Sequence, residues 1–268
     1  MMRKNGSVPI GNTEVYYAAF GNGQRHLVVL PGLSDGLTTV KGKALLLAPP
    51  YKKFLSDYTV YMFSRKNAMS AGYSIREMAA DQVQVMKRLG IAQADVLGVS
   101  QGGMIAQYIA IDYPEMVDNL ILAVTAPYAN DVVTKVVTAW MEMADRGDHT
   151  ALMLDTAEKM YSEKYLKRHR RLFPLLARFT KPAGYERFLV NANAILSFDA
   201  REELAMIVCP TLIIAGEDDR TVGNEARDAL HRGIAGSELY VYPGLGHGAY
   251  EEAGDFYDRV LAFCSASL

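Results

Sequence analysis

The sequence predicts an α/β fold with a mostly parallel central sheet, helices on both faces of the sheet, and a helical segment inserted between the sixth and seventh strands. Short apolar runs rich in β-branched residues alternate with amphipathic helical patterns, which is typical of a sheet buried on both faces. The chain has 268 residues, half of them apolar, which is enough for one large core. One long stretch without a strand pattern interrupts the alternation.

Eight strands are expected in chain order. The first two, over 7–10 and 14–20, flank Gly11-Asn12 and form an antiparallel hairpin. The other six are short apolar runs over 27–30, 59–63, 95–99, 120–124, 211–215 and 238–242. Helical periodicity lies between them at about 74–90, 101–113, 222–232 and 251–266. This spacing is that of right-handed strand-helix-strand crossovers.

The insertion is expected at residues 128–205, as a helical cap on a core domain made of residues 1–127 and 206–268. No strand pattern occurs in it, and it is rich in Met, Leu, Phe and Tyr. It holds 12 basic and 11 acidic residues, so its charges balance. The basic run from Lys164 to Arg171, with His169 inside it, is therefore interpreted as a solvated helix face rather than an anion site.

Composition excludes several classes of partner. The 28 Lys and Arg nearly balance 30 Asp and Glu, so no net field favours nucleic acid or an anionic membrane. No apolar run is long enough to span a bilayer, and none follows the charged start of the chain. We expect a cytoplasmic protein that binds a small-molecule substrate and neither nucleic acid nor membrane. Homo-oligomer formation stays open.

The two cysteines indicate a reducing compartment. Cys209 opens a predicted strand and Cys264 lies in the last helix, and two buried free thiols explain both residues more simply than a disulfide does. No Cys and His spacing typical of metal ligands occurs, so neither a metal nor another cofactor is expected.

The strongest chemical motif is Gly98-Val99-Ser100-Gln101-Gly102, which lies between an apolar strand and a helical pattern. A turn this tight strains the backbone at the serine, and a Cβ at either glycine would collide with neighbouring strands. The serine hydroxyl would stand at a helix start, where amides favour negative charge. A glycine-rich helix start with a capping serine is the structural alternative, and the preceding strand favours the nucleophile.

A serine nucleophile needs a base, and the base needs an acid that orients it. Of the five histidines, His247 alone lies in a glycine-rich loop directly after a predicted strand. That edge of an open parallel sheet is where such folds bind ligands. The strand over 211–215 runs into Glu217-Asp218-Asp219 at the same edge, which gives the chain order serine, acid, histidine.

The whole chain resembles the α/β-hydrolase superfamily, in particular its small capped serine esterase, thioesterase and haloperoxidase-like branch. The segments that carry this resemblance include Leu30-Pro31-Gly32, the turn at Ser100, Asp112-Tyr113-Pro114, Cys209-Pro210-Thr211 and Gly246-His247. The resemblance implies a triad of Ser100, Asp219 and His247. It selects Asp219 over Asp218 as the acid, and it implies an oxyanion hole made by the backbone amides of Leu33 and Gln101.

Two positions depart from the family pattern. Relatives usually carry His-Gly where this chain has Pro31-Gly32, and they often carry an Asp at the end of the fourth strand, where this chain has Ser64-Arg65. Because the oxyanion hole uses backbone amides, the missing histidine need not remove it. Epoxide hydrolases and haloalkane dehalogenases of similar sequence have Asp at the nucleophile position, so Ser100 points to acyl transfer instead.

These observations predict a serine hydrolase that cleaves an ester, thioester or related acyl bond of a small, largely apolar substrate through an acyl-enzyme. Candidate pocket residues in and beside the cap are Tyr128, Trp140, Met141, Met143, Phe173 and Phe179. A small-molecule receptor with incidental turnover remains an alternative, because such receptors can keep the triad. A perhydrolase or haloperoxidase, a carbon–carbon bond hydrolase and an acyltransferase also remain, since they share the same residues.

Overall fold

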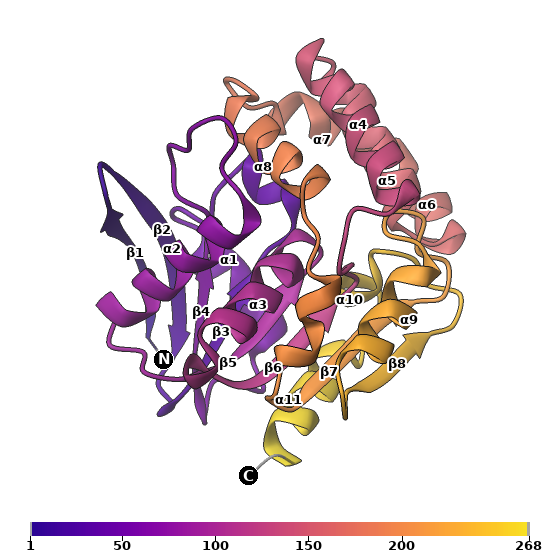
Figure 1. The fold of residues 1–268 in the computed structure, drawn as a ribbon. Coiled ribbons are helices and arrows are strands. Elements are labelled where there is room, and N and C mark those ends of the chain that lie inside the picture. The colour runs from indigo at the N-terminus through magenta and orange to yellow at the C-terminus, as the bar shows by residue number, and fades with distance from the viewer. Residues whose placement is uncertain (1, 267–268) are drawn as a thin grey trace.

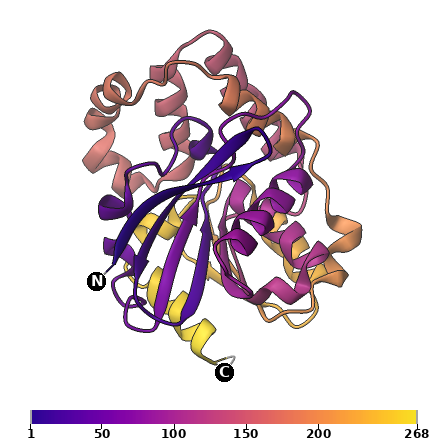
Figure 2. The ribbon, with the colours of Figure 1, turned by 90° about the vertical axis from the view of Figure 1, so that its left-hand side faces the viewer.

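The central sheet has eight strands in the order β1-β2-β4-β3-β5-β6-β7-β8 in this computed structural model, which describes residues 2–266. β1 pairs antiparallel with β2, β2 pairs antiparallel with β4, and all other neighbours are parallel. The strands are β1 Arg3–Ile10, β2 Thr13–Gly21, β3 Arg25–Leu30, β4 Tyr58–Phe63, β5 Ala94–Val99, β6 Val117–Ala123, β7 Thr211–Gly216 and β8 Glu238–Tyr242. Figure 2 shows the β1–β2 hairpin in front of the twisted sheet. The predicted fold class is confirmed.

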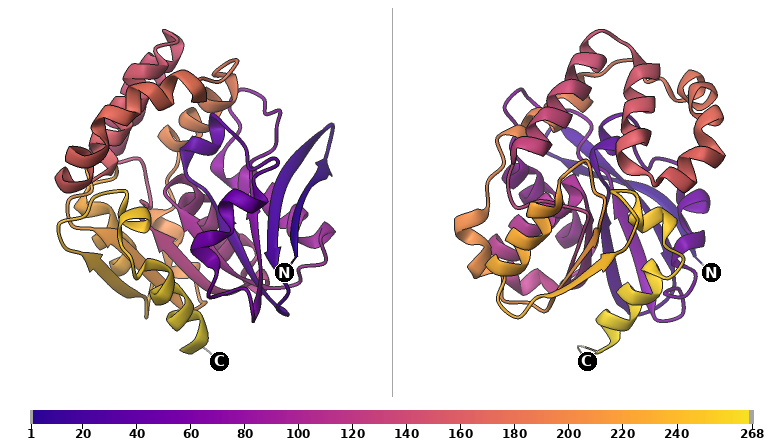
Figure 3. Two further views of the ribbon diagram at one scale, coloured as in Figure 1. Left: turned by 180° about the vertical axis from the view of Figure 1, so that it is seen from behind. Right: turned by 90° about the vertical axis from the view of Figure 1, so that its right-hand side faces the viewer.

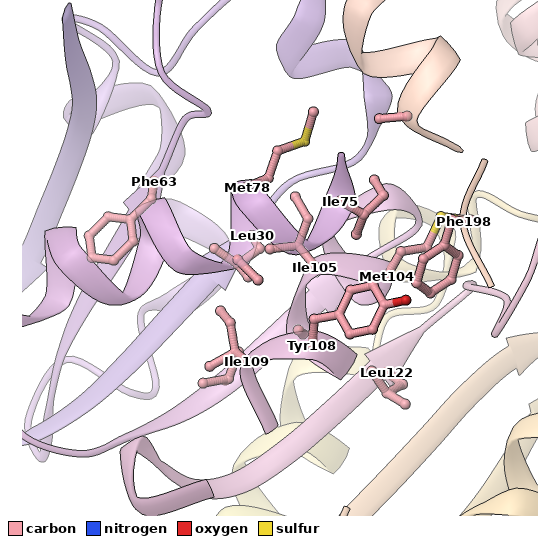
Figure 4. Packing of buried hydrophobic residues seen from close by; sticks show 14 of the residues in the cluster. Leu30, Phe63, Ile75, Met78, Met104, Ile105, Tyr108, Ile109, Leu122 and Phe198 are labelled. Carbon is pink, nitrogen blue, oxygen red and sulfur yellow. The ribbon is translucent and has the colours of Figure 1, made fainter. Parts of the chain in front are cut away.

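Helices cover both faces of the sheet (Figure 1). One face packs against α2 (Ile75–Arg88), α3 (Gln101–Asp112) and α9 (Asn224–Gly233), and the other packs against α1 (Ala44–Leu47) and α11 (Phe256–Ala266). Figure 4 shows the first layer, where Met104, Ile105 and Ile109 of α3 lie close to Leu30 and Leu122 of the sheet. Because each strand sends alternate side chains to opposite faces, two apolar clusters form, one on each side.

The start of α2 illustrates how local sequence specifies an element. The Ser74 side chain accepts from the Glu77 amide, and the Glu77 carboxylate accepts from the Ser74 amide, which makes a reciprocal capping box. Lys87 and Arg88 stand in the last turn, where they complement the helix dipole. Caps of this kind stabilise a helix by ~1 kcal/mol. The sequence pattern places this helix within two residues of its observed ends.

Five α-helices and no strand of the sheet lie between β6 and β7, which confirms the predicted helical cap. They are α4 Asp131–Asp145, α5 His149–Met160, α6 Glu163–His169, α7 Phe173–Thr180 and α8 Glu186–Leu196. Figure 3 shows them together over the carboxyl ends of the parallel strands. The division of the chain into core and cap domains at 128 and 205 stays a prediction.

Some boundaries differ from those expected. β1 begins at Arg3 rather than Ser7, because the pairing with β2 continues through polar residues that carry no strand pattern. The final helical region splits into α10 (Ala249–Glu252) and α11. Cys264 is buried as expected, whereas Cys209 is only half-buried, and both are free thiols. Within residues 2–266, no helix combines the length and apolar character needed to cross a bilayer.

Candidate active site

Ser100 lies in a strained turn between β5 and α3. Its φ of 54° and ψ of −120° are unusual for a residue with a side chain. The turn is tight enough that a Cβ built on Gly102 would lie 1.9 Å from the Leu30 carbonyl oxygen, and one on Gly98 would lie 2.5 Å from the Gly102 oxygen. Glycine is therefore required on both sides of the serine, as the motif predicted. The strain holds the hydroxyl above the sheet edge.

The side chains of Ser100, His247 and Asp219 form a continuous hydrogen-bonded relay. The His247 Nε2 lies 3.0 Å from the Ser100 Oγ, and the His247 Nδ1 lies 2.8 Å from the Asp219 Oδ2. His247 and Asp219 are 4% and 7% exposed, so the relay is shielded from water apart from the serine. A histidine held in this way can accept the hydroxyl proton while the carboxylate stabilises the resulting imidazolium.

Asp219 is held in one orientation by the backbone. Its Oδ1 accepts hydrogen bonds from the amides of Thr221 at 2.8 Å and Val222 at 3.0 Å, which leaves Oδ2 for the histidine. Asp218 is exposed, and its backbone amide, rather than its side chain, bonds to the Leu245 carbonyl. Of the two neighbouring acids, Asp219 alone contacts His247.

The His247 loop is in close contact with the end of α5 in the cap. The Gly248 amide donates to the Met160 carbonyl at 2.7 Å. A Cβ on Gly246 would lie 2.8 Å from the same carbonyl oxygen, and one on Gly248 would lie 2.8 Å from the Tyr161 ring. The glycines that flank the histidine in the sequence are thus needed because the cap backbone approaches the loop closely.

The amides of Leu33 and Gln101 stand at the starts of the 3-10 helix Leu33–Gly36 and of α3. First-turn amides have no acceptor within their own helix. Within residues 2–266, neither amide donates to another group. A Cβ on Gly32 would lie 3.2 Å from the Ser100 Cβ, so the loop that carries Leu33 passes directly beside the nucleophile candidate. The two amides are thus available to an oxyanion.

A buried ionic cluster, which sequence reasoning did not identify, lies behind this loop. The Arg65 Nη2 donates to the Gly32 carbonyl at 3.1 Å and to the Gln101 Oε1 at 2.6 Å. The Asp35 Oδ2 accepts from the Arg65 backbone amide at 2.9 Å and pairs with Arg187 of α8 at 2.6 Å. The cluster joins both oxyanion-hole candidates to the last helix of the cap.

Arg65 is fully buried in this cluster. Burial lowers the pKa of the Arg65 guanidinium to about 10, while the Asp35 carboxylate opposes that shift, so the side chain stays charged at neutral pH. The Arg65 Nε has no hydrogen-bond partner among the described residues, which adds to the cost of burial. Ser64, the first residue of the Ser64-Arg65 pair that departs from the family pattern, accepts from the Val40 amide. The only sequence signal for the cluster is this departure at Ser64-Arg65.

A cavity of about 220 Å³ opens at Ser100 and His247. Its wall is formed mainly by α5, whose residues 152, 153, 156, 157 and 160 share one helical face. The remaining lining residues are Gly32, Leu33, Ser34, Leu37, Trp140, Tyr161, Phe173, Phe188, Tyr250 and Glu251. The one carboxylate in the lining belongs to Glu251, which accepts from the Tyr161 hydroxyl at 2.6 Å. The cavity is mainly apolar, and its one carboxylate is exposed to solvent.

The structure places two of the six predicted pocket residues, Trp140 and Phe173, in this cavity. Met141 and Met143 lie on the same helix as Trp140 but pack against the core. Tyr128 instead bonds to Glu225 and stacks under Arg201, and Phe179 is 81% exposed. The apolar character of these residues predicted that their side chains are buried, but it did not indicate whether they point into the cavity, into the core or to the surface. The helical spacing of Leu152, Met153 and Met160 was the signal that would have found the true wall.

No cluster of three or more His, Cys, Asp or Glu side chains suited to a metal ion occurs within the described part of the chain.

Comparison with known proteins identifies relatives over nearly the full length. A model of the alpha/beta hydrolase fold family matches residues 26–254. The AB hydrolase superfamily protein YisY of Bacillus subtilis (strain 168) is 30% identical over 205 residues, which cover 73% of this chain and 75% of that protein. The human serine hydrolase BPHL is 23% identical over 94% of this chain and 83% of its own length. Among solved structures, MGS-M2, an alpha/beta hydrolase enzyme from a deep-sea metagenome library of the Medee basin, superposes with a TM-score of 0.86 at 22% identity over 97% of both chains.

Proposed function

The chain belongs to the alpha/beta hydrolase fold family, and from this premise we propose that it is a serine hydrolase with Ser100 as nucleophile, His247 as general base and Asp219 as the orienting acid. The observation that carries the proposal is the relay from the Ser100 Oγ through both nitrogens of His247 to the buried Asp219 carboxylate. The name of the human relative, a serine hydrolase, is consistent with it.

The proposed cycle follows from the positions of these groups. Ser100 attacks the carbonyl carbon as His247 takes its proton, and the oxyanion accepts hydrogen bonds from the Leu33 and Gln101 amides. His247 then protonates the leaving group, which departs and leaves an acyl-enzyme. Water activated by the same histidine hydrolyses this ester and restores the serine. Apart from the attacking water, the groups used in this cycle belong to this chain.

The cavity supports a neutral, largely apolar acyl group as substrate. Its wall carries no Lys or Arg, and its single carboxylate, on Glu251, is exposed to solvent. An anionic acyl group entering this cavity would lose hydration without gaining a cationic partner, and it would also be repelled by Glu251. We therefore propose a small uncharged ester, thioester or related acyl compound. The helical cap, as a substrate-selecting domain over 128–205, is part of the same proposal.

This proposal predicts repeated turnover of p-nitrophenyl butyrate and slower turnover of the p-nitrophenyl monoester of succinic acid, which has the same chain length and a terminal carboxylate. We expect kcat/KM to be roughly tenfold or more lower for the anionic ester, because the carboxylate is desolvated without compensation. Glu251→Gln should lower the ratio of the two kcat/KM values only a few-fold, since Glu251 is exposed to solvent. A single burst without turnover of either ester would indicate a receptor rather than an enzyme.

The cap is predicted to control acyl-chain length through Trp140. Trp140→Ala should raise KM for long-chain p-nitrophenyl esters by about tenfold while leaving acetate hydrolysis nearly unchanged, because we expect a short acyl group to make little contact with the cap. Met141→Ala is the matched control, since Met141 is the next residue of α4 and does not line the cavity. Equal losses on short and long esters, with a lower melting temperature, would show that Trp140 is only structural.

A further inference from the structure

The outer side of the cap carries an apolar stripe in contact with solvent. Leu172, Leu175, Leu176 and Phe179 have exposed fractions of 46 to 81%, and they follow the i, i+3, i+4, i+7 spacing of one helical face. We call these four residues, with the exposed cations between 163 and 181, the outer cap surface. In Figure 3, viewed from behind, α7 runs across the outside of the cap, away from the sheet.

A different face of α7 packs into the cap. It carries Phe173 and Ala177, which are buried, and Phe173 also lines the active-site cavity. The helix thus has an inner apolar face with a partner and an outer apolar face without one. Four large apolar side chains gathered on one exposed helical face are typical of a surface that contacts another protein or a membrane.

The charge around the stripe is strongly positive. Seven of the 19 residues from 163 to 181 are Lys or Arg and one, Glu163, is acidic, although the whole chain has a net charge of −2. All seven cations are exposed: Lys164, Lys167, Arg168, Arg170, Arg171, Arg178 and Lys181. Because a charge is screened over roughly 8–10 Å, a partner at this surface responds mainly to these cations and to the acidic residues beside them, Glu158 and Glu163.

The arrangement of the cations adds a second observation. Lys167, Arg170 and Arg171 line a surface depression together with Arg220, which comes from the loop after β7. Glu158 and Glu163 also line it, and Glu158 pairs with Arg170. The other cations of the depression have no ion-pair partner within the described residues. An anionic head group fits such a depression beside an apolar stripe.

We propose that the outer cap surface docks the protein on an anionic lipid bilayer, with the apolar stripe among the acyl chains and the cations at the head groups. An amphipathic helix with leucine and phenylalanine on one side and basic residues around it binds bilayers in this way. A second copy of the chain fits less well, since a symmetric contact would bring two sets of seven cations together. A nucleic acid could contact the cations, but it would leave the apolar stripe exposed to water.

The outer cap surface is separate from the active site. Phe173 contributes to the cavity from the same helix that carries the outer stripe, so α7 separates the cavity from the proposed bilayer. The interaction is independent of the serine chemistry. It can therefore be tested with the Ser100→Ala protein, and failure of either proposal leaves the other standing.

The test is flotation of the full chain with vesicles made of equal amounts of phosphatidylcholine and phosphatidylglycerol, compared with phosphatidylcholine alone. Wild type should float with the mixed vesicles only. Lys167→Glu/Arg168→Glu/Arg171→Glu should lower the partition coefficient by about 100-fold, at roughly fivefold per cation. Leu175→Ser/Phe179→Ser should lower it by about tenfold or more, because both side chains lose their place among the acyl chains.

Matched controls come from exposed residues elsewhere. Lys52→Glu/Lys87→Glu/Arg232→Glu makes the same change in net charge, and Leu46→Ser removes a leucine that is 73% exposed on α1. Both should bind like wild type, and circular dichroism should show all variants folded. The proposal would be overturned if wild type did not bind the mixed vesicles. It would also be overturned if the charge-control variant lost as much of the partition coefficient as the variant of the outer cap surface. Unchanged binding by Leu175→Ser/Phe179→Ser, or a wild-type dimer that these two substitutions convert to monomers, would overturn it as well.

Discussion

Ser100→Ala should abolish covalent labelling by a fluorophosphonate and lower ester turnover by roughly 10³-fold to 10⁶-fold, because the Ser100 hydroxyl lies beside both the proposed base, His247, and the unpaired amides proposed as oxyanion donors. The substitution removes one oxygen from a partly exposed side chain whose hydrogen bond is to His247. The fold should therefore persist, with an unchanged circular dichroism spectrum. Intact-mass spectra of wild type and variant after exposure to the reagent provide the measurement.

Ser34 offers a matched control for this experiment. It is an exposed serine that lines the same cavity, and it makes no hydrogen bond to a histidine in the described residues. Ser34→Ala should label with the same stoichiometry as wild type. Labelling that survives in Ser100→Ala and disappears in Ser34→Ala would show that the nucleophile had been assigned to the wrong residue.

Asp219→Asn should lower kcat by roughly 10⁴-fold while preserving the fold, through an effect on the histidine tautomer. The amides of Thr221 and Val222 both donate toward one side of the side chain, so the carbonyl oxygen of the new asparagine will turn toward them. Its NH₂ group then faces the His247 Nδ1, which must accept. The proton of the imidazole moves to Nε2, and the histidine can no longer take a proton from Ser100.

Asp218→Asn separates this effect from a general loss of negative charge. The Asp218 side chain is exposed one residue away, so its substitution should change kcat less than twofold. The kcat of both variants on p-nitrophenyl butyrate, with their melting temperatures, provides the comparison. The opposite ranking of the two variants would assign the acid to Asp218.

The site could be predicted from sequence where its geometry is local. Gly98 and Gly102 flank Ser100 because the backbone of this turn touches β3 and α3, so the motif itself reports the close approach. His247 could be singled out because it follows a strand of the parallel sheet, and the strands of such a sheet end at one edge. The choice of Asp219 over Asp218 depended on family resemblance, since side-chain direction in that loop follows from bonds to Thr221 and Val222.

Side chains of the cap were harder to place. Trp140, Met141 and Met143 lie within four residues of one helix, yet only Trp140 reaches the cavity. Apolar character predicts that a side chain is buried, but the rotation of a helix about its axis is decided by what packs against it. For the same reason Phe179, predicted as a pocket residue, faces solvent.

The sequence by itself determined the alternation of strands and helices, the place of the cap and the strained turn at Ser100, because short-range spacing and backbone sterics specify them. Only the tertiary structure decided which helix lines the cavity and how Arg65, Asp35 and Arg187 meet, because those contacts join residues more than 25 positions apart. It also placed the basic run, interpreted from the sequence as a solvated helix face, beside an exposed apolar stripe. Composition sums charge along the chain, whereas folding distributes it in space, and electrostatic attraction depends on distance.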